Sequence, residues 1–343
     1  MTSFEFLIPG DIGLATGGYV YDREVIARAG GALSHVALPG GFPSPSPADL
    51  EAVRDRLARA TGPVLIDGLA GGVLPAEMVA AAPVPIVALC HHPLGLETGL
   101  APERAATLLE GEAEVLAACA HVVVTSRTTA RALERHLGVA ADDITVAEPG
   151  LARRDPAPRT DAVPVILTVA SLTPRKGHDV LLAALERVRD RAWRALWIGA
   201  DTLDPDWAAQ LEEMRGASPV GDRIARQGTL DAAALAEAYG GAHVFCLPSH
   251  YEGYGMAFAE AMMAGLPVVA CAAGAVPEVV PESAGLLVEP GDPIALGNAL
   301  DRVLRDGELA GRMAAAGHAH ALTLPDWDDT AATILDVLRG VAR

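Results

Sequence analysis

Short, continuously apolar runs alternate with alanine-rich stretches of helical periodicity along most of the chain, and this alternation limits the fold more than any other feature. In the first half we expect strands at residues 4–9, 63–68, 85–90, 121–126 and 143–148. Strands that are apolar throughout, rather than at every second position, are typical of sheets covered on both faces. The pattern therefore predicts an α/β fold with parallel, doubly wound sheets.

The alternation starts again after residues 151–164, a segment rich in proline, arginine and aspartate whose lack of periodicity is typical of a linker. The strands expected beyond it lie at 165–171, 194–200, 223–228, 243–249, 267–272 and 285–290. A chain of 343 residues has room for two domains. We predict Rossmann-like domains over 1–155 and 156–326, and the last helix, 327–343, is a candidate to pack back onto the first. Because ligands of such sheets bind beyond the carboxyl ends of the strands, we expect the domains to face a cleft.

The net charge of the chain limits the classes of molecule that we expect it to bind. The chain has 26 lysine and arginine residues against 44 aspartate and glutamate residues, a formal net charge of −18. Nucleic acids and anionic lipid surfaces are bound by clustered cations, so we expect neither as a partner. Only one of the basic residues, Lys176, is a lysine. A preference for arginine codons explains why lysine is scarce but not why this one is present, so Lys176 is a candidate for chemistry.

Cysteine usage and apolar segments indicate the compartment. Four scattered cysteines lack the spacing of zinc or redox sites and are expected to be reduced. The amino-terminal residues have no basic region and too short an apolar run for a signal peptide. Elsewhere proline or glycine interrupts the apolar stretches before they reach the length of a membrane span. We therefore expect a cytoplasmic protein without stable membrane insertion, and a homodimer is left open.

The most informative motif lies at residues 250–270, HYEGYGMAFAEAMMAGLPVVA. Glu252 follows an expected strand, a glycine-flanked turn comes next, and Glu260 lies inside an apolar helix. Free amides at the start of that helix are suited to a diphosphate, and the two carboxylates are suited to hydroxyl groups of ribose and sugar. The residues expected to bind through this turn are Gly253, Tyr254, Gly255 and Met256. The alternative is a capped surface helix, which an unpaired charge within an apolar run disfavours.

A second motif, at residues 169–185, places Arg175 and Lys176 between a strand and a helix start. Paired cations there predict a second phosphate contact at the same edge of the sheet. The alternative is a pair of solvated turn cations, which the presence of the chain's single lysine makes less attractive. The motif lacks the glycine and serine or threonine spacing of a P-loop.

Two weaker signals lie in the first half. Gly17 and Gly18 follow the first expected strand, without the G-x-G-x-x-G spacing of dinucleotide-binding proteins. His91 and His92 end another strand, and adjacent residues of an extended chain point in opposite directions. The two rings therefore do not predict a shared metal, and we expect His91 alone to face the cleft.

Taken together, these motifs resemble glycosyltransferase family 4, the large retaining group with the GT-B fold. The resemblance covers the whole chain and is carried by E-x7-E from Glu252 to Glu260, the TPRKGHDVLLAAL turn, the early glycine pair and the histidine at a strand end. Ser171 stands where the family often has an arginine, and Arg175 is the candidate to replace that arginine.

The resemblance implies a role for each site residue. Lys176 would bind the donor diphosphate, Glu260 the ribose, and Glu252 with the backbone of 253–256 the sugar and phosphate. Gly17 and Gly18 would close on the diphosphate from the first domain, with His91 near the transferred sugar. Lys176, Arg175, Glu252 and His91 are thus the expected catalytic residues, and Gly17, Gly18, Ser171, Gly253, Tyr254, Gly255, Met256 and Glu260 the expected donor-binding residues.

The implied activity is transfer of a hexose from a nucleotide-diphosphate sugar to a hydroxyl of a small molecule or soluble glycan, without a cofactor or a metal. The base of the nucleotide is left open. Two alternatives are an epimerase or hydrolase of nucleotide sugars with the same fold, and a non-catalytic subunit that binds nucleotide sugars.

Overall fold

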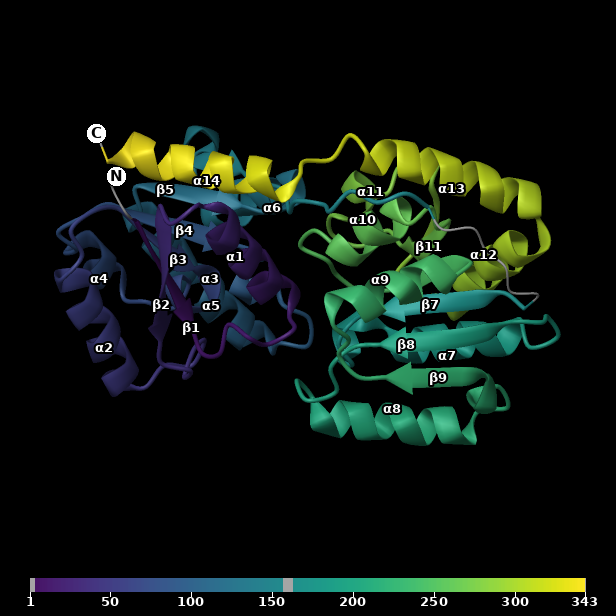
Figure 1. The fold of residues 1–343 in the computed structure, drawn as a ribbon. Coiled ribbons are helices and arrows are strands. Elements are labelled where there is room, and N and C mark those ends of the chain that lie inside the picture. Colours follow the sequence, from purple (N-terminus) through teal and green to yellow (C-terminus); the bar gives the residue numbers. More distant parts are fainter. Residues whose placement is uncertain (1–3, 157–162, 343) are drawn as a thin grey trace. The chain divides into compact units, whose positions relative to one another are not determined.

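The chain forms two compact units in a computed structural model that describes residues 4–156 and 163–342. Met1–Gly150 and Pro325–Arg343 belong to unit 1, and Leu151–Leu324 form unit 2 (Figure 1). Part of the expected linker, residues 157–162, lies outside the described residues. We describe each unit by itself.

Each unit contains one six-stranded sheet in which all neighbouring strands are parallel. The strands of unit 1 are β1 (Phe4–Pro9), β2 (Leu33–Leu38), β3 (Val64–Asp67), β4 (Ile86–Cys90), β5 (His121–Val124) and β6 (Ile144–Val146). Those of unit 2 are β7 (Val165–Val169), β8 (Arg194–Ile198), β9 (Ile224–Gln227), β10 (Val244–Leu247), β11 (Val268–Cys271) and β12 (Gly285–Val288). The prediction of two doubly wound parallel sheets is confirmed.

Helices connect the strands, as parallel pairing requires. Unit 1 contains α1 (Gly17–Arg28), α2 (Pro47–Ala58), α3 (Gly68–Gly71), α4 (Ala76–Ala80), α5 (Pro102–Ala118), α6 (Arg127–Ala132) and α14 (Trp327–Val341). Unit 2 contains α7 (His178–Arg187), α8 (Pro205–Ala217), α9 (Ala232–Gly241), α10 (Met256–Met263), α11 (Val276–Val279), α12 (Pro293–Arg305) and α13 (Gly307–Ala321).

The strand order places a topological switch point in each sheet. The order in unit 1 is β2-β1-β3-β4-β5-β6, so the chain winds in opposite directions from β1 and from β3. The order in unit 2 is β12-β11-β10-β7-β8-β9, with the reversal between β7 and β10. At such a point neighbouring connections diverge and leave a crevice beyond the carboxyl ends of the strands. The loops after β1, β3, β7 and β10 are therefore where binding residues are expected.

Strand β2 was not predicted because its sequence does not look like a buried strand. Its six residues, LSHVAL, are buried only at the two ends, since β2 lies at the edge of its sheet. The central strands behave differently: every residue of β3, β4, β10 and β11 is buried. Continuous apolarity thus identifies the central strands, whereas the exposed residues in the middle of β2 leave it with too weak an apolar pattern.

The carboxyl-terminal helix α14 is part of unit 1, where it packs beside α1 (Figure 1). Asp326 caps the helix through the amides of Asp328 and Asp329, and Asp329 completes a capping box. Ile334 and Leu338 are fully buried in the core that contains β1 and α1.

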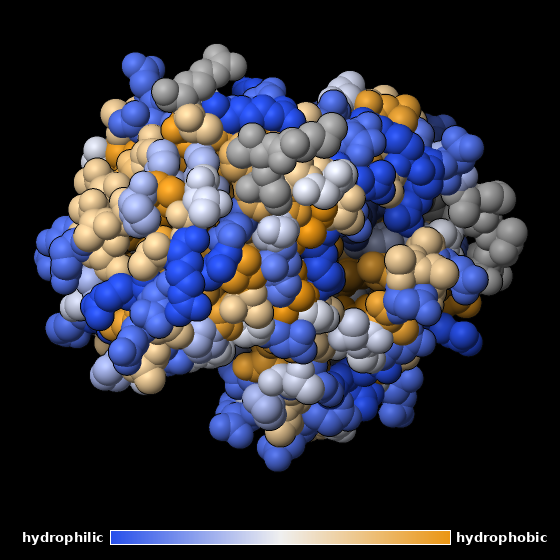
Figure 2. Space-filling model, turned by 60° about the vertical axis from the view of Figure 1, so that its left-hand side comes forward, coloured by the Kyte–Doolittle hydropathy of each residue, from blue (hydrophilic) through white to orange (hydrophobic). Residues whose placement is uncertain are grey.

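The surface offers few large apolar side chains. Those exposed in the described part are Leu14, Leu203, Met214, Ile294 and Leu322. On the face in Figure 2, hydrophobic patches are interrupted by hydrophilic residues. Among the described residues, no helix combines the length and the apolarity needed to cross a bilayer.

The packing of α14 generates a stability prediction. Ile334→Ala should lower the free energy of unfolding of unit 1 by about 2–5 kcal/mol, because it leaves a cavity in a close-packed core. Asp336→Ala, on the exposed face of the same helix, should change it by less than about 0.5 kcal/mol. Urea unfolding followed by circular dichroism measures both, and equal effects would contradict the placement of α14.

Candidate functional site

Two cations and a carboxylate meet at the switch point of unit 2. Lys176 Nζ donates a hydrogen bond to Glu252 Oε1 at 2.7 Å, and Arg175 NH1 lies 3.7 Å from Glu252 Oε2. Lys176 belongs to a short turn after β7, and Glu252 follows β10, so the pair bridges the two strands between which the sheet reverses. Ser249 Oγ donates a further hydrogen bond to Glu252 Oε1 at 2.6 Å.

The backbone joins these two loops as well. Arg175 NH1 donates to the carbonyl oxygen of Tyr251 at 2.9 Å, and the His250 amide donates to the carbonyl of Arg175 at 2.8 Å. Gly177 has a φ of +67°, and a Cβ there would lie 2.3 Å from the carbonyl oxygen of Pro248. Only glycine fits this close approach, so Gly177 allows the cationic turn to lie against the loop after β10.

The charge of Glu252 depends on this cluster. Its side chain is 7% exposed, and burial favours the neutral form. Lys176 and Arg175, with hydrogen bonds from Lys176 and Ser249, outweigh burial and hold the pKa of Glu252 below its usual value. Glu252 is therefore ionised at neutral pH, and two cations against one carboxylate leave the cluster with a net positive charge.

Glu260 lies in a second polar group of unit 2, on α10. Its Oε2 accepts a hydrogen bond from the Tyr239 hydroxyl at 2.8 Å, and the Arg154 guanidinium lies 5.9 Å from the centre of the Tyr239 ring. Burial raises the pKa of Glu260, while the Tyr239 hydrogen bond and Arg154 act in the opposite direction. This partly buried carboxylate can accept hydrogen bonds from the hydroxyl groups of a ligand.

Helix α10 begins directly after the expected glycine turn. Gly255 is its N-cap, with a φ of +96°, and Met256 is its first residue. The first amides of a helix have no partner within the helix, and the helix dipole favours an anion there. Gly253, Tyr254, Gly255 and Met256 thus lie in one turn between Glu252 and Glu260, as predicted, and Tyr254 is buried.

In unit 1 the glycine pair and His91 lie together. Gly17 and Gly18 begin α1, capped by Thr16, which accepts a hydrogen bond from the Tyr19 amide. A Cβ on Gly18 would lie 3.3 Å from Cδ2 of His91, so the glycine gives room for the imidazole. The Tyr21 ring meets the same imidazole edge to face, with centroids 5.2 Å apart.

Two buried carboxylates that we did not predict also contact His91. Its Nε2 lies 3.2 Å from Asp22 Oδ1 and 3.5 Å from Asp67 Oδ2. Asp22 lies on α1 and Asp67 at the end of β3, while His91 directly follows β4. The potential ligand atoms of the three residues lie within 4.8 Å of one another, a spacing that a metal ion could use. Because the imidazole is already paired with both carboxylates, we interpret the group as a charged histidine cluster.

The pKa values in this cluster depend on one another. Burial favours neutral His91, but Asp22 and Asp67 outweigh it and raise the pKa of His91 to about 10. Burial also raises the pKa of Asp22 to about 6, although His91 opposes that change. At neutral pH the histidine is therefore protonated and Asp22 ionised.

The expected site residues thus form three groups. In unit 2, Arg175, Lys176 and Glu252 form one group, with Ser171 just after β7, and Glu260 forms another. Gly18 and His91 form the third, in unit 1. Asp22, Asp67, Ser249 and Tyr239 were missed. Asp67 ends an apolar strand, and that position could have identified it as a candidate site residue. Asp22 and Tyr239 lie within helices, where nothing in the sequence distinguishes them from other helical residues.

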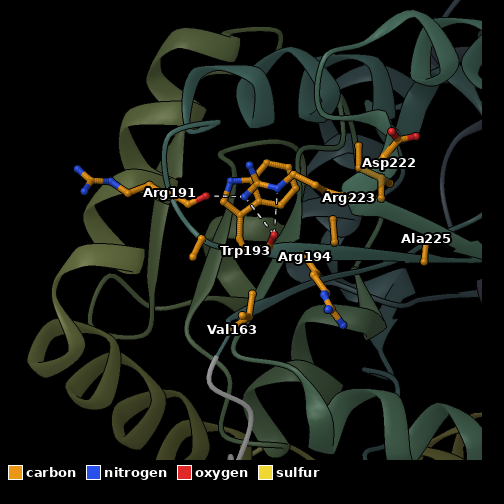
Figure 3. A pocket seen from close by; sticks show the side chains of 10 residues that line it. Val163, Arg191, Trp193, Arg194, Asp222, Arg223 and Ala225 are labelled. Carbon is orange, nitrogen blue, oxygen red and sulfur yellow. Dashed lines mark hydrogen bonds between the residues drawn. The ribbon is translucent and has the colours of Figure 1, made fainter.

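A cavity of unit 2 lies away from these groups. It has a volume of about 530 Å³ and is lined by residues at the amino ends of β8 and β9, the edge opposite the switch-point loops (Figure 3). Arg223 covers the Trp193 ring at 3.6 Å and donates to the carbonyls of Arg189 and Trp193. These contacts hold Arg223 against other parts of the protein, so we do not take this cavity as the candidate functional site.

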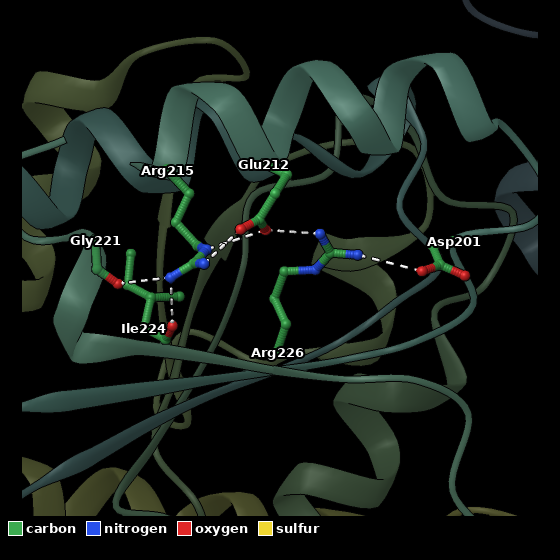
Figure 4. Close-up of polar contacts among 6 residues, drawn as sticks. All are labelled: Asp201, Glu212, Arg215, Gly221, Ile224 and Arg226. Carbon is green, nitrogen blue, oxygen red and sulfur yellow. Dashed lines mark hydrogen bonds and ion pairs between the residues drawn. The ribbon is translucent and has the colours of Figure 1, made fainter. Parts of the chain in front are cut away.

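Another arginine group supports the loop after β8, at the same edge as the site. Arg226 of β9 pairs with Glu212 of α8 at 2.8 Å and with Asp201 at 3.4 Å (Figure 4). Arg215 also binds Glu212, and its hydrogen bond is the main reason why the pKa of Glu212 falls to about 2. These arginines are neutralised by carboxylates, unlike the cationic cluster at Lys176.

Two sequence families match the chain. The family described as Glycosyl transferases group 1 matches residues 153–320, and Glycosyltransferase Family 4 matches residues 21–153. A D-inositol 3-phosphate glycosyltransferase of Xylanimonas cellulosilytica is 33% identical over an alignment of 260 residues that covers 71% of this chain and 62% of that protein. The chain thus spans less than two thirds of the length of this relative. A GDP-mannose-dependent alpha-(1-6)-phosphatidylinositol monomannoside mannosyltransferase of Mycobacterium tuberculosis is 31% identical over 52% of this chain and 48% of its own.

Solved structures share the fold. Sucrose-phosphate synthase from Thermosynechococcus elongatus superposes with a TM-score of 0.83 and 24% identity over 99% of both chains. Anabaena HepE in complex with UDP-glucose gives a TM-score of 0.81 and 17% identity over 98% of this chain and 99% of that one. The chain therefore has the GT-B fold, as expected from the motifs.

The close approach at Gly177 generates a second prediction. Gly177→Ala should lower the free energy of unfolding by more than about 1 kcal/mol, because it combines a left-handed backbone with a steric clash. Gly216→Ala, in α8 with no atom within 4 Å of the added Cβ, should leave stability unchanged or raise it by less than about 1 kcal/mol. Urea unfolding compares the two, and a neutral Gly177→Ala would contradict the geometry of the turn.

Proposed function

Because the chain belongs to glycosyltransferase family 4, we propose that it transfers a hexose from a nucleoside diphosphate sugar to a hydroxyl group of an acceptor, with retention of the anomeric configuration. The observation that carries the proposal is the meeting of the chain's only lysine with the first glutamate of the E-x7-E motif at the switch point of unit 2.

The electrostatics of unit 2 suit a diphosphate. Lys176 and Arg175 outnumber the one carboxylate that neutralises them, and the amides at the start of α10 follow the same loop. Hydrogen-bond donors and cations fixed in place before the reaction stabilise a leaving group without reorganisation. Glu252 keeps the lysine amine in position until the diphosphate arrives, and its carboxylate can then accept hydrogen bonds from the sugar.

Glu260 is suited to the ribose. Its carboxylate is held by Tyr239 on one oxygen, and a carboxylate can accept hydrogen bonds from both hydroxyls of a vicinal diol. Glu260 lies one helical turn after the start of α10. The proposed ribose contact therefore lies next to the proposed diphosphate contact, as the two groups are neighbours in a nucleoside diphosphate.

In the transfer step, the bond between the anomeric carbon and the diphosphate oxygen breaks as the acceptor oxygen attacks from the same face. The acceptor proton passes to the departing phosphate oxygen, so no protein nucleophile is needed. Lys176 and Arg175 stabilise the charge that develops on the diphosphate, and His91 orients a hydroxyl of the substrate. These cations replace a metal, so we propose that transfer is independent of metal ions.

Relatives suggest the substrate class. The Xylanimonas relative is named for D-inositol 3-phosphate and the Mycobacterium relative for a phosphatidylinositol mannoside, and both compounds contain an inositol ring. We propose a hydroxyl of a cyclic polyol as the acceptor. The relatives include a GDP-mannose-dependent enzyme and a protein bound to UDP-glucose, so the donor test includes both bases.

The direct test incubates purified protein and EDTA with UDP- and GDP-hexoses, with and without inositol and inositol phosphate. We expect a glycosylated polyol with one donor. Lys176→Ala should lower kcat/KM for transfer by roughly 30- to 1,000-fold, the equivalent of about 2–4 kcal/mol of lost transition-state stabilisation. The exposed Arg305→Ala should retain wild-type turnover.

Other outcomes identify the alternatives. Donor turnover without an acceptor would favour a hydrolase or epimerase, and tight donor binding without turnover a non-catalytic subunit. Activity that is lost with EDTA and restored by a divalent ion would overturn metal independence. A Lys176→Ala protein that folds and transfers sugar at the wild-type rate would overturn the role of the lysine.

Glu260 has its own prediction. Glu260→Gln should weaken binding of the nucleoside diphosphate by about tenfold or more, because an amide loses one of the two acceptor oxygens and its charge. Glu213→Gln, an exposed substitution on α8, is the matched control. Isothermal titration calorimetry measures both, and equal Kd values for the two variants would count against the ribose contact.

A further inference from the structure

The imidazole of His91 faces two carboxylates through a single nitrogen. Its Nε2 lies 3.2 Å from Asp22 Oδ1 and 3.5 Å from Asp67 Oδ2. The side chains of these aspartates are almost fully buried, whereas His91 exposes 24% of its side chain. His91 Nδ1 makes no hydrogen bond to the residues that the structure describes. One ring nitrogen is therefore committed to the protein and the other is available.

No other cation in the described part of unit 1 balances these carboxylates as closely. Arg23 is the one other cation that acts on Asp22, and its guanidinium donates to the carbonyl oxygens of Ile12 and Leu14. The neighbouring groups Tyr19 and Tyr21 are neutral, and burial followed by Asp67, Asp22 and Asp11 raises the pKa of Tyr19 to about 12. Asp67 also caps α3 through the Leu69 amide, so one of its oxygens is already used.

The number of neighbouring carboxylates determines whether Nδ1 of His91 donates or accepts a hydrogen bond. A neutral histidine that donates through Nε2 has a lone pair on Nδ1, which then only accepts hydrogen bonds. A histidine that carries both protons donates through both nitrogens. Two buried carboxylates beside one imidazole favour the doubly protonated form, because an unpaired charge at either aspartate would be costly.

We propose that Asp22 is a positioning residue for sugar transfer: with Asp67 it holds His91 as an imidazolium whose Nδ1–H donates a hydrogen bond to a hydroxyl of the substrate. The inference rests on the proposed function for the substrate, but the charge state of His91 can be measured without any substrate. Asp22 Oδ2 is buried and has no hydrogen-bond partner among the described residues, so Asp22 makes no alternative structural contact that would explain its burial.

The first measurement is an NMR titration of the free protein labelled at histidine, with His91→Gln to assign the resonance. Asp22 and Asp67 should keep His91 protonated above about pH 8.5, well above the value near 6.5 of an unperturbed histidine. In Asp22→Asn the pKa should fall by more than one unit, because one of the two charges is gone while the shape is kept. The exposed Asp142→Asn should leave it unchanged.

The second measurement is the pH dependence of transfer. With wild-type protein kcat should not fall between pH 6.5 and 8.5 through titration of His91. In Asp22→Asn kcat should fall at least tenfold as the pH rises through the lowered pKa, because a deprotonated Nδ1 cannot donate, and it should recover at lower pH. A residue that only stabilises the fold would lower activity equally at all pH values.

The outcomes distinguish a failure of the inference about Asp22 and His91 from a failure of the proposed function. A His91 that titrates near pH 6.5 in wild-type protein overturns the inference even if Asp22→Asn fails to fold, and so does an Asp22→Asn enzyme with an unchanged pH profile. A His91 resonance that shifts on addition of EDTA would mean that a metal ion occupies the cluster, which also overturns it. Absence of transfer by wild-type protein, with His91 protonated as expected, would instead contradict the proposed function.

Discussion

The ion pair between Lys176 and Glu252 is the constraint on which the site of unit 2 depends. Its members follow β7 and β10, the two strands between which the sheet reverses, so the pair exists only if the doubly wound topology forms. A buried pair of this kind contributes little net stability, since desolvation of both charges offsets their attraction. Ligand binding therefore explains the arrangement of this ion pair better than a contribution to stability does.

Unit 1 places ionisable groups by the same topological rule. Asp67 ends β3 at the switch point, His91 follows the neighbouring β4, and Asp22 comes from the helix after β1. The charges differ from those of unit 2: here one cation lies against two carboxylates, whereas there one carboxylate lies against two cations. Each cluster thus keeps a net charge at the crevice of its own sheet, and the two net charges have opposite signs.

Sequence reasoning singled out the residues that the structure brings together in unit 2, because each of them lies in a segment with its own signal. Lys176 was conspicuous as the single lysine, and Glu252 and Glu260 were fixed by spacing within one strand–turn–helix segment. It missed a contact between distant segments: Asp22 lies in a helix whose sequence does not single it out, and its contact with His91 spans 69 residues. The edge strand β2 was missed for a related reason, because half of its side chains are exposed and its apolar pattern is weak.

A crystal structure of the protein bound to a nucleoside diphosphate tests the central claim most directly. We expect the diphosphate to lie within hydrogen-bond distance of Lys176 Nζ and of the amides at the start of α10, with both ribose hydroxyls on Glu260. A diphosphate bound elsewhere, with Lys176 still paired only to Glu252, would contradict the account.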